Sequence, residues 1–267
     1  MNPDFGKNTV TICMETHGKN KDIKVTEIKK LDWELSKIVD IKSISPTVKL
    51  FSLKTEKNYT IEPGQHFDIK LVSSSGYEAQ RSYSVIAKSS TTNEIDFAIS
   101  KINDGEVSNY MHEKLQISQK IYIRGPIGKY FNLKKHIAKS VILIAGGIGI
   151  TPFIYFLRKQ NYQHKTTLIY SAKNNNEYLF RDELENKNTL NENFNLIVTL
   201  TKEQKQNWNG LRIRINSAIL KKEMKAHYSL KTTYFICGGS SFVENISSKI
   251  VKLGVEHQQI KLERFGP

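Results

Sequence analysis

Short runs in which apolar and polar residues alternate occupy the first half of the chain. Alternation with a period of two places every second side chain on one face, which is typical of a half-buried β-strand. The turn signals Ser45-Pro46 and Glu62-Pro63-Gly64-Gln65 interrupt the alternation. The runs are Lys37 to Ile44, Thr47 to Leu53, Phe67 to Val72, Arg81 to Ile86, Glu94 to Ile102 and Gln119 to Arg124. Short strands joined by turns, with little helix between them, predict a small closed antiparallel β-barrel.

The pattern changes after Ala138, where apolar runs alternate with segments of helical periodicity. The expected strands are Val141 to Ala145, Thr167 to Ser171, Asn195 to Thr199 and Thr233 to Cys237. The expected helices lie near Pro152 to Lys159, Phe180 to Glu185, Arg214 to Lys222 and Phe242 to Leu253. This alternation predicts an α/β domain with a parallel sheet and crossover helices. We therefore expect a β-barrel domain over residues 35–135 and an α/β domain over residues 136–267, with the boundary near Asn132 to Ala138.

Residues 1–34 precede these two patterns and form an N-terminal extension. Thr9 to Met14 could form a short strand, and the polar stretch His17 to Lys24 is typical of a loop. The sequence assigns no function to this extension.

A glycine-rich turn follows the first expected strand of the α/β domain. Gly146, Gly147 and Gly149 leave backbone amides uncovered, and Pro152 suits the first turn of the helix that follows. The positive end of that helix and the bare amides could bind a pyrophosphate without any charged side chain. The spacing departs from the dinucleotide fingerprint G-x-G-x-x-G, so an ordinary strand-to-helix turn is the alternative.

The expected barrel carries three further clusters of residues that could bind a ligand. On one strand, Arg81 and Tyr83 would share a face, so a cation and an aromatic ring could together hold a phosphate and a flat ring. Asp104 to Tyr110 reads as a glycine turn that enters a short helix, whose free amides again suit a phosphate. Gly125 to Phe131 contains two glycines that would let a bulky ligand approach the backbone. Taken alone, Arg81 and Tyr83 are more typical of an exposed arginine and a half-buried tyrosine on a barrel strand. Either of the other two runs could equally be a plain turn.

Composition excludes several classes of protein. No apolar run reaches about 18 residues, so we expect no transmembrane helix, and the polar start Met-Asn-Pro-Asp-Phe is not a signal peptide. Two cysteines, Cys13 and Cys237, are too few for a disulfide framework or a four-thiolate iron–sulfur cluster, and they favour a reducing cytoplasm. The formal net charge of +14 could attract nucleic acid, an anionic membrane or an acidic protein. The lysines are scattered without a basic block or an aromatic ladder, so we expect no nucleic-acid partner.

Other catalytic arrangements find little support. The seven histidines show no ligand spacing, so we expect no metal site. Ser84 has no His and Asp partners at motif spacing, which argues against a hydrolase triad.

The clusters together resemble those of the ferredoxin-NADP reductase-like flavoprotein family, and they occur in the same order. The resemblance covers the chain from about Ser36 to the C-terminus. It rests on Arg81-Ser82-Tyr83-Ser84, Gly105-Glu106-Val107-Ser108, Gly125-Pro126-Ile127-Gly128, Gly146-Gly147-Ile148-Gly149-Ile150-Thr151-Pro152, Cys237-Gly238-Gly239 and Glu263-Arg264-Phe265. It implies a flavin-binding barrel followed by a nicotinamide-nucleotide-binding domain, without a fused iron–sulfur domain.

The resemblance also implies roles in flavin binding. Arg81 would bind the flavin phosphate beside Ser82, Tyr83 would pack on the isoalloxazine ring, and Ser84 would lie near the flavin N5 atom. The turn that includes Gly105, Val107 and Ser108 would bind a pyrophosphate, with Lys101 on the preceding strand close by. A pyrophosphate site favours FAD, and FMN is the alternative.

The remaining motifs are assigned to the nicotinamide nucleotide by the same resemblance. The residues of the glycine-rich turn would bind the dinucleotide, namely Gly146, Gly147, Ile148, Gly149, Thr151 and Pro152. Cys237, followed by Gly238, and Glu263 would flank the nicotinamide ring, and Phe265 occupies the place of the family's terminal aromatic residue. We expect Ser84, Cys237 and Glu263 to be the catalytic residues.

The sequence departs from the family's pattern in two places. Gly239 and Phe242 stand where members often have proline and methionine, so the backbone near the nicotinamide could be looser. Lysines, Lys173 and Lys202, replace arginines that often grip the 2′-phosphate of NADP, and a lysine neutralises a phosphate only as a point charge. No acidic residue ends the strand Thr167 to Ser171, so we expect NADPH to be preferred to NADH.

The resemblance therefore predicts an enzyme that transfers a hydride from NAD(P)H to FAD and passes electrons to an acceptor such as ferredoxin, another redox protein of acidic character, or a small molecule. A different class of function remains open, a catalytically silent binding or regulatory subunit that retains the reductase fold.

Overall fold

The structure is a computed structural model and describes residues 31–137, 139–160, 164–227 and 231–266. The expectations for Cys13, for a strand from Thr9 to Met14 and for a loop from His17 to Lys24 lie outside the described residues.

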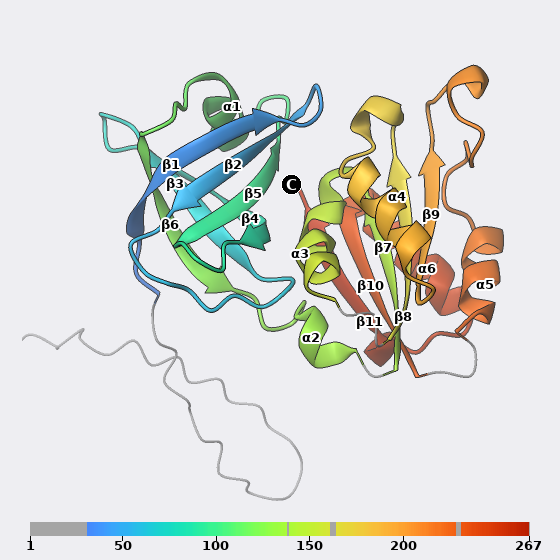
Figure 1. The fold of residues 1–267 in the computed structure, drawn as a ribbon. Coiled ribbons are helices and arrows are strands. Elements are labelled where there is room, and N and C mark those ends of the chain that lie inside the picture. The colour runs from blue at the N-terminus through green and yellow to red at the C-terminus, as the bar shows by residue number, and fades with distance from the viewer. Residues whose placement is uncertain (1–30, 138, 161–163, 228–230, 267) are drawn as a thin grey trace, which may run out of the picture. The chain divides into compact units, whose positions relative to one another are not determined.

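The first half of the described chain folds into a closed barrel, in which the strand order is β1-β2-β5-β4-β3-β6 (Figure 1). The barrel closes because β1 pairs antiparallel with both β2 and β6. Its elements are β1 (Glu34–Ser43), β2 (Val48–Lys54), β3 (His66–Val72), β4 (Glu78–Lys88), β5 (Glu94–Ser100), helix α1 (Glu106–Glu113) and β6 (Lys120–Ile127).

The barrel is filled by side chains from alternate strand positions. The rings of Phe67 and Phe97 meet edge to face with their centroids 6.0 Å apart, and Phe51 is equally buried. Val107 and Met111 on α1 pack against the same core, so this helix is fixed to the barrel by its apolar face. Burial of these side chains supplies the main stabilisation of the barrel domain.

The second half contains a five-stranded parallel sheet of order β11-β10-β7-β8-β9. Its strands are β7 (Ser140–Gly146), β8 (Lys165–Ala172), β9 (Phe194–Leu200), β10 (Thr232–Gly239) and β11 (Ile260–Phe265). Its helices are α3 (Thr151–Lys159), α4 (Arg181–Leu190), α5 (Ser217–Lys225) and α6 (Ser240–Lys252). Single-turn 3-10 helices are η1 (Gly147–Ile150), η2 (Asn175–Glu177), η3 (Lys205–Asn207) and η4 (His257–Gln259).

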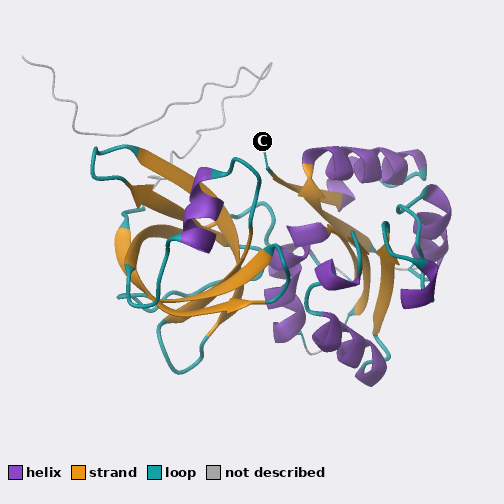
Figure 2. Ribbon diagram, turned by 90° about the horizontal axis from the view of Figure 1, so that it is seen from above, coloured by secondary structure: helices purple, strands orange, loops and turns teal. Residues whose placement is uncertain are grey.

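Helices cover both faces of this sheet, as Figure 2 shows. The strand β7 divides its side chains between two cores, because successive residues point to opposite faces. Leu143 packs into the core that contains residues of α3 and α4, whereas Ile142 and Ile144 pack into the core that contains residues of α5 and α6. A strand buried on both faces explains why its sequence is apolar without alternation.

The fold class predicted from the sequence is confirmed, with some differences in the elements. β11 is an additional strand beyond those expected, and the expected boundary segment contains the short helix α2 (Leu133–His136), which Asn132 caps by accepting a hydrogen bond from the Lys135 amide. None of the helices in the described ranges is long and apolar enough to cross a membrane.

Candidate active site

A cavity of about 890 Å³ brings together most of the barrel motifs and the C-terminal motif of the sequence. Its lining comes from β4, from the segment that leads into α1, from the turn after β6, from the start of the α3 region and from β11. The predicted site residues that line it are Arg81, Ser82, Tyr83, Ser84, Gly105, Val107, Ser108, Ile148, Thr151, Glu263 and Phe265.

Arg81 and Tyr83 both face this cavity, as expected for residues two positions apart on β4. The Arg81 side chain is exposed, and its Nη1 atom donates a hydrogen bond to the Gln80 carbonyl at 2.8 Å. No carboxylate within the described ranges forms an ion pair with Arg81. Burial raises the pKa of Tyr83 well above its ordinary value, so the phenol is neutral at physiological pH.

Ser82 differs from its neighbours because a structural network occupies its hydroxyl. Ser82 Oγ donates to Asp68 Oδ1 at 2.6 Å, and Asp68 Oδ2 accepts from Arg124 Nη2 at 2.7 Å. This network ties β3, β4 and β6 together on one side of the barrel. The hydroxyl of Ser82 is therefore committed to a protein partner.

Ser84 and Glu263 place two unpartnered polar atoms on residues that line the cavity. Ser84 Oγ and Glu263 Oε2 are buried and have no hydrogen-bond partner within the described ranges. Burial raises the pKa of Glu263 to about 7, and the nearby Ser84 hydroxyl opposes that rise. The geometry between the two side chains does not meet the criteria of a hydrogen bond. Buried polar atoms normally find partners, so this pair fits a ligand with hydrogen-bonding groups at its edge.

The N-terminus of α1 supplies backbone amides to the same cavity. Gly105 is the N-cap residue, and the first amides of an α-helix have no partner inside the helix. Ser108 Oγ accepts a hydrogen bond from the Ile102 amide at 3.2 Å and donates to the Gly105 carbonyl at 3.3 Å, which fixes the turn. The turn thus offers free amides and the positive end of a helix, which suit a phosphate group.

The expected place of Lys101 requires correction. β5 ends at Ser100, so Lys101 lies beyond the strand and not on it. Its Nζ atom forms an ion pair with Glu113 Oε1 at 2.8 Å, and Lys101 does not line the cavity. The ammonium group is therefore paired with a carboxylate on α1.

The glycine-rich turn after β7 lies beside Cys237. Gly147 adopts a φ of +55°, a conformation that favours glycine. A Cβ atom on Gly149 would overlap the backbone carbonyl of Cys237, so the turn approaches β10 closely. Ile148 and Thr151 of this region reach the cavity, and Thr151 Oγ1 donates to the Ile148 carbonyl at 3.0 Å. Pro152 occupies the first turn of α3, as predicted.

Cys237 itself is fully buried and does not line the cavity. Burial raises the pKa of its thiol, and the neighbouring Glu263 carboxylate raises it further. Cys237 stands directly beside Glu263 in the pairing of β10 with β11. Gly238, the next residue, also lies outside the cavity lining.

Lys173 and Lys202 lie side by side at the carboxyl ends of β8 and β9. The Lys202 amide donates to the Lys173 carbonyl at 2.7 Å, and both side chains are exposed. Neither lines the cavity. Ligands of open α/β sheets bind outside the carboxyl ends of the strands, so this edge suits the distal half of an extended dinucleotide.

Sequence reasoning misses two polar residues close to these groups. His66 lines the cavity and pairs with Ser84 in the β3–β4 ladder, and burial lowers its pKa. Glu203, next to Lys202, accepts a hydrogen bond from the Asn175 amide at 2.6 Å. The adjacency of Glu203 to Lys202 is visible in the sequence, whereas the position of His66 depends on strand pairing.

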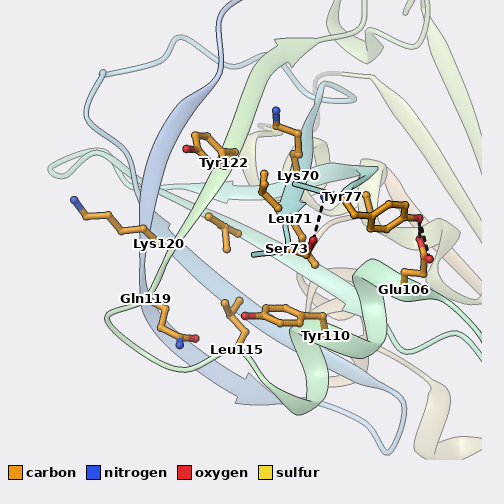
Figure 3. A pocket seen from close by; sticks show the side chains of 13 residues that line it. Lys70, Leu71, Ser73, Tyr77, Glu106, Tyr110, Leu115, Gln119, Lys120 and Tyr122 are labelled. Carbon is orange, nitrogen blue, oxygen red and sulfur yellow. Dashed lines mark hydrogen bonds between the residues drawn. The ribbon is translucent and has the colours of Figure 1, made fainter. Parts of the chain in front are cut away.

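A second cavity, of about 430 Å³, lies on the barrel between α1, the β3–β4 turn and the start of β6 (Figure 3). None of the predicted site residues lines it. Glu106, the first residue of α1, borders both cavities.

Comparison with known proteins identifies two domain families along the chain. Residues 35–131 match the family model of the oxidoreductase FAD-binding domain, and residues 143–248 match that of the oxidoreductase NAD-binding domain. FAD and a nicotinamide dinucleotide, the cofactors expected from the sequence, are therefore the cofactors of the matched domains.

Among curated proteins, the chain is 26% identical over 213 residues to the glycine betaine monooxygenase reductase subunit of Chromohalobacter salexigens, which covers 78% of this chain and 57% of that protein. It is 31% identical over 179 residues to NADH-cytochrome b5 reductase 2 of Mycosarcoma maydis, which covers 65% of this chain and 50% of that protein. The chain thus spans little more than half the length of the curated relatives it matches.

Solved structures share the fold. A ferredoxin NADP+ reductase from Neisseria gonorrhoeae with bound FAD and NADP superposes with a TM-score of 0.74 at 22% identity, covering 87% of this chain and 98% of that one. The CS-b5R domains of human Ncb5or superpose with a TM-score of 0.78 at 20% identity, covering 88% of this chain and 70% of that one.

Proposed function

Because the chain belongs to the ferredoxin-NADP reductase-like flavoprotein family, we propose that it is a reductase that accepts a hydride from NAD(P)H and delivers electrons to a separate acceptor. The observation that carries the proposal is the cavity that joins Arg81, Tyr83, Ser84 and Glu263. The FAD domain extends over residues 35–135 and the nucleotide domain over residues 136–267, and residues 1–34 have no assigned role. FAD and NAD(P)H supply the hydride chemistry when they are bound.

Arg81 and the N-terminal turn of α1 hold the flavin phosphates in this proposal. The Arg81 guanidinium is exposed and has no carboxylate partner within the described ranges, so it is available to a phosphate. Gly105, Val107 and Ser108 border the same cavity. The Gly105 amide donates to the Ile102 carbonyl, whereas the first amides of α1 itself have no partner inside the helix. A turn with several free amides suits a pyrophosphate, which favours FAD over FMN.

Tyr83 sets the plane of the flavin ring, and Ser84 with Glu263 manages hydrogen bonds and protons at its edge. The neutral Tyr83 phenol offers a flat apolar face to the ring. Glu263, with a pKa of about 7, exchanges a proton near neutral pH, which is the property of an efficient acid or base. Ser84 Oγ has no competing partner within the described ranges and is free to bind the flavin edge.

The glycine-rich turn and the edge formed by Lys173 and Lys202 hold the nicotinamide dinucleotide. Gly146, Gly147 and Gly149 give the pyrophosphate access to backbone amides. The two lysines neutralise the 2′-phosphate on the adenosine ribose, which favours NADPH over NADH. Cys237 and Gly238 lie on β10 and support the nicotinamide site through the position of the strand's backbone. The Cys237 thiol itself is buried and does not line the cavity.

The acceptor is an acidic redox protein or a small molecule. The formal net charge of +14 supports an acidic partner because opposite charges accelerate encounter. A cytoplasmic location completes the proposal, which the low cysteine content supports.

The test is spectroscopic. The purified protein should be yellow, heat should release FAD and not FMN, and anaerobic NADPH or NADH should bleach the flavin bands within seconds. A colourless protein that takes up neither flavin contradicts the proposal. A yellow protein whose flavin is reduced by dithionite but by neither nicotinamide nucleotide would instead be a flavin-binding subunit without reductase activity.

A further inference from the structure

A hydrogen bond joins the β3–β4 turn to the first residue of α1. The Tyr77 hydroxyl lies 3.0 Å from each carboxylate oxygen of Glu106, as the dashed lines in Figure 3 show. The turn fixes Tyr77, because its amide donates to Ser73 Oγ at 3.0 Å and its carbonyl accepts from the Ser73 amide at 2.9 Å. The carboxylate is therefore held by a residue whose own backbone is fixed.

The position of Glu106 makes this contact relevant to the flavin site. Glu106 directly follows Gly105 and borders both the flavin cavity and the smaller cavity on the barrel, whereas Tyr77 borders only the smaller one. An acidic side chain at the first turn of α1 competes with a phosphate for the same positive environment. The Glu106 carboxylate would therefore weaken phosphate binding at this helix end unless another residue holds it away from the phosphate.

Arg81 and Glu106 both line the larger cavity, so the two opposite charges border the same space. The hydrogen bond that the Tyr77 hydroxyl donates to Glu106 raises the pKa of Tyr77, and the Arg81 guanidinium opposes that rise. No ion pair joins Arg81 to Glu106 in the described part of the chain. Two opposite charges thus flank one phenol without contacting each other.

We propose that Tyr77 is a positioning residue for flavin binding, whose hydroxyl holds the Glu106 carboxylate and keeps it from pairing with Arg81. Arg81 consequently stays available to the flavin phosphate. The inference rests on the proposed function, because it takes Arg81 as a phosphate ligand. Tyr77 and Glu106 are both exposed, so solvent screens the competition and the effect is moderate.

The test is a double-mutant cycle on the release of FAD. The holoprotein, Tyr77→Phe, Glu106→Gln and the double variant are diluted, and the fluorescence of released FAD gives the dissociation constant. Tyr77→Phe alone should weaken FAD binding about threefold to fivefold, because the freed carboxylate competes for Arg81. In the Glu106→Gln background the same change should alter affinity by less than about 1.5-fold, because no charge remains to compete.

Tyr110→Phe is the matched control. Tyr110 lies on α1 and borders the same small cavity, and no hydrogen bond of its hydroxyl appears within the described ranges. This variant should bind FAD as the parent does, and all variants should keep the parent's circular dichroism spectrum.

Two results overturn the inference. Equal FAD affinity of Tyr77→Phe and the parent shows that the hydroxyl has no role in flavin binding. Equal weakening by Tyr77→Phe in the parent and in the Glu106→Gln background shows that the tyrosine acts by packing alone. A parent that holds no FAD overturns the proposed function together with this inference, whereas a parent that holds FAD without coupling between the two residues overturns this inference alone.

Discussion

Cys237 and Glu263 stand opposite each other on the parallel strands β10 and β11, yet of the two residues only Glu263 lines the larger cavity. The thiol is completely buried, and both burial and the neighbouring carboxylate raise its pKa. Cys237 is therefore protonated at neutral pH and unsuited to act as a nucleophile. The two residues therefore differ in role. Cys237 packs in the core of the sheet, whereas Glu263 presents a titratable carboxyl group to the cavity.

Glu263→Gln should change how stability depends on pH. Burial sets the pKa of Glu263 at about 7 in the folded protein, against an ordinary value of 4.5. Between these values the unfolded chain releases the proton first, so the parent loses stability as pH rises from about 4.5 to 7. The loss is about 3 kcal/mol at most, and it is complete above about pH 7.

The glutamine variant has no such proton and should gain stability relative to the parent at about pH 8 but not at about pH 4.5. Thermal unfolding of the flavin-free proteins at both pH values measures this difference. A difference between parent and variant that is the same at both pH values would show that the Glu263 pKa is ordinary.

Much of the fold is predictable because it follows local patterns. Alternation identifies the barrel strands, and apolar runs identify β7, β8, β9 and β10. β11 is not predicted, because its sequence, Ile-Lys-Leu-Glu-Arg-Phe, is short, charged and only partly buried. It forms a strand because it pairs with β10. The four-residue helix α2 is too short for a periodic signal.

The candidate site is predictable only as far as its motifs are local. The sequence suggests that Arg81 and Tyr83 share a face, and both line the cavity. The proximity of Ser84 to Glu263 depends on how the barrel and the sheet pack, which no local pattern encodes. The expectation that Lys101 lies on β5 is wrong, because the sequence shows neither that the strand ends at Ser100 nor that Glu113 pairs with the ammonium group. A role of Lys101 in cofactor binding stays a prediction.

Arg81→Ala should weaken flavin binding roughly tenfold or more. The change removes a charge-assisted contact to phosphate, worth about 1.5 to 3 kcal/mol. Retention of FAD during gel filtration, followed by absorbance, measures the effect. Arg212→Ala removes the same charge from an exposed position outside the cavity and should retain FAD. An Arg81 variant that retains FAD as tightly as the parent would place Arg81 outside the flavin site.

Gly149→Ala should destabilise the protein by about 1 to 3 kcal/mol, because the new methyl group meets backbone atoms of Cys237 and Gly238 that cannot move aside. It should also raise the KM for the nicotinamide nucleotide by displacing the glycine-rich turn. Gly239→Ala is the control, since a methyl group there meets nothing within 4 Å and its φ of −63° suits any residue. Urea unfolding compares the two, and equal midpoints would contradict the close approach of the turn to β10.

Replacing Lys173 and Lys202 together with alanine should reduce the preference for NADPH over NADH. The hydrogen bond between their backbones places both side chains at one edge of the sheet, where they can neutralise the additional phosphate of NADPH. Glu203, next to Lys202, forms no ion pair with either lysine within the described ranges, and its carboxylate accepts hydrogen bonds from the amides of Asn175 and Gln204. Exposed lysines contribute about 1 to 3 kcal/mol in total, so the ratio of the two kcat/KM values should fall roughly tenfold and at most about a hundredfold.

Steady-state reduction of an artificial acceptor with each nucleotide measures that ratio. A double variant on α5, Lys221→Ala with Lys225→Ala, removes the same charge from exposed positions away from this edge and should leave the ratio unchanged. If the parent prefers NADH, or if both double variants change the ratio equally, the lysines act only through the general positive charge of the chain. A loss of preference confined to the Lys173 and Lys202 variant would instead locate the adenosine phosphate at the carboxyl ends of β8 and β9.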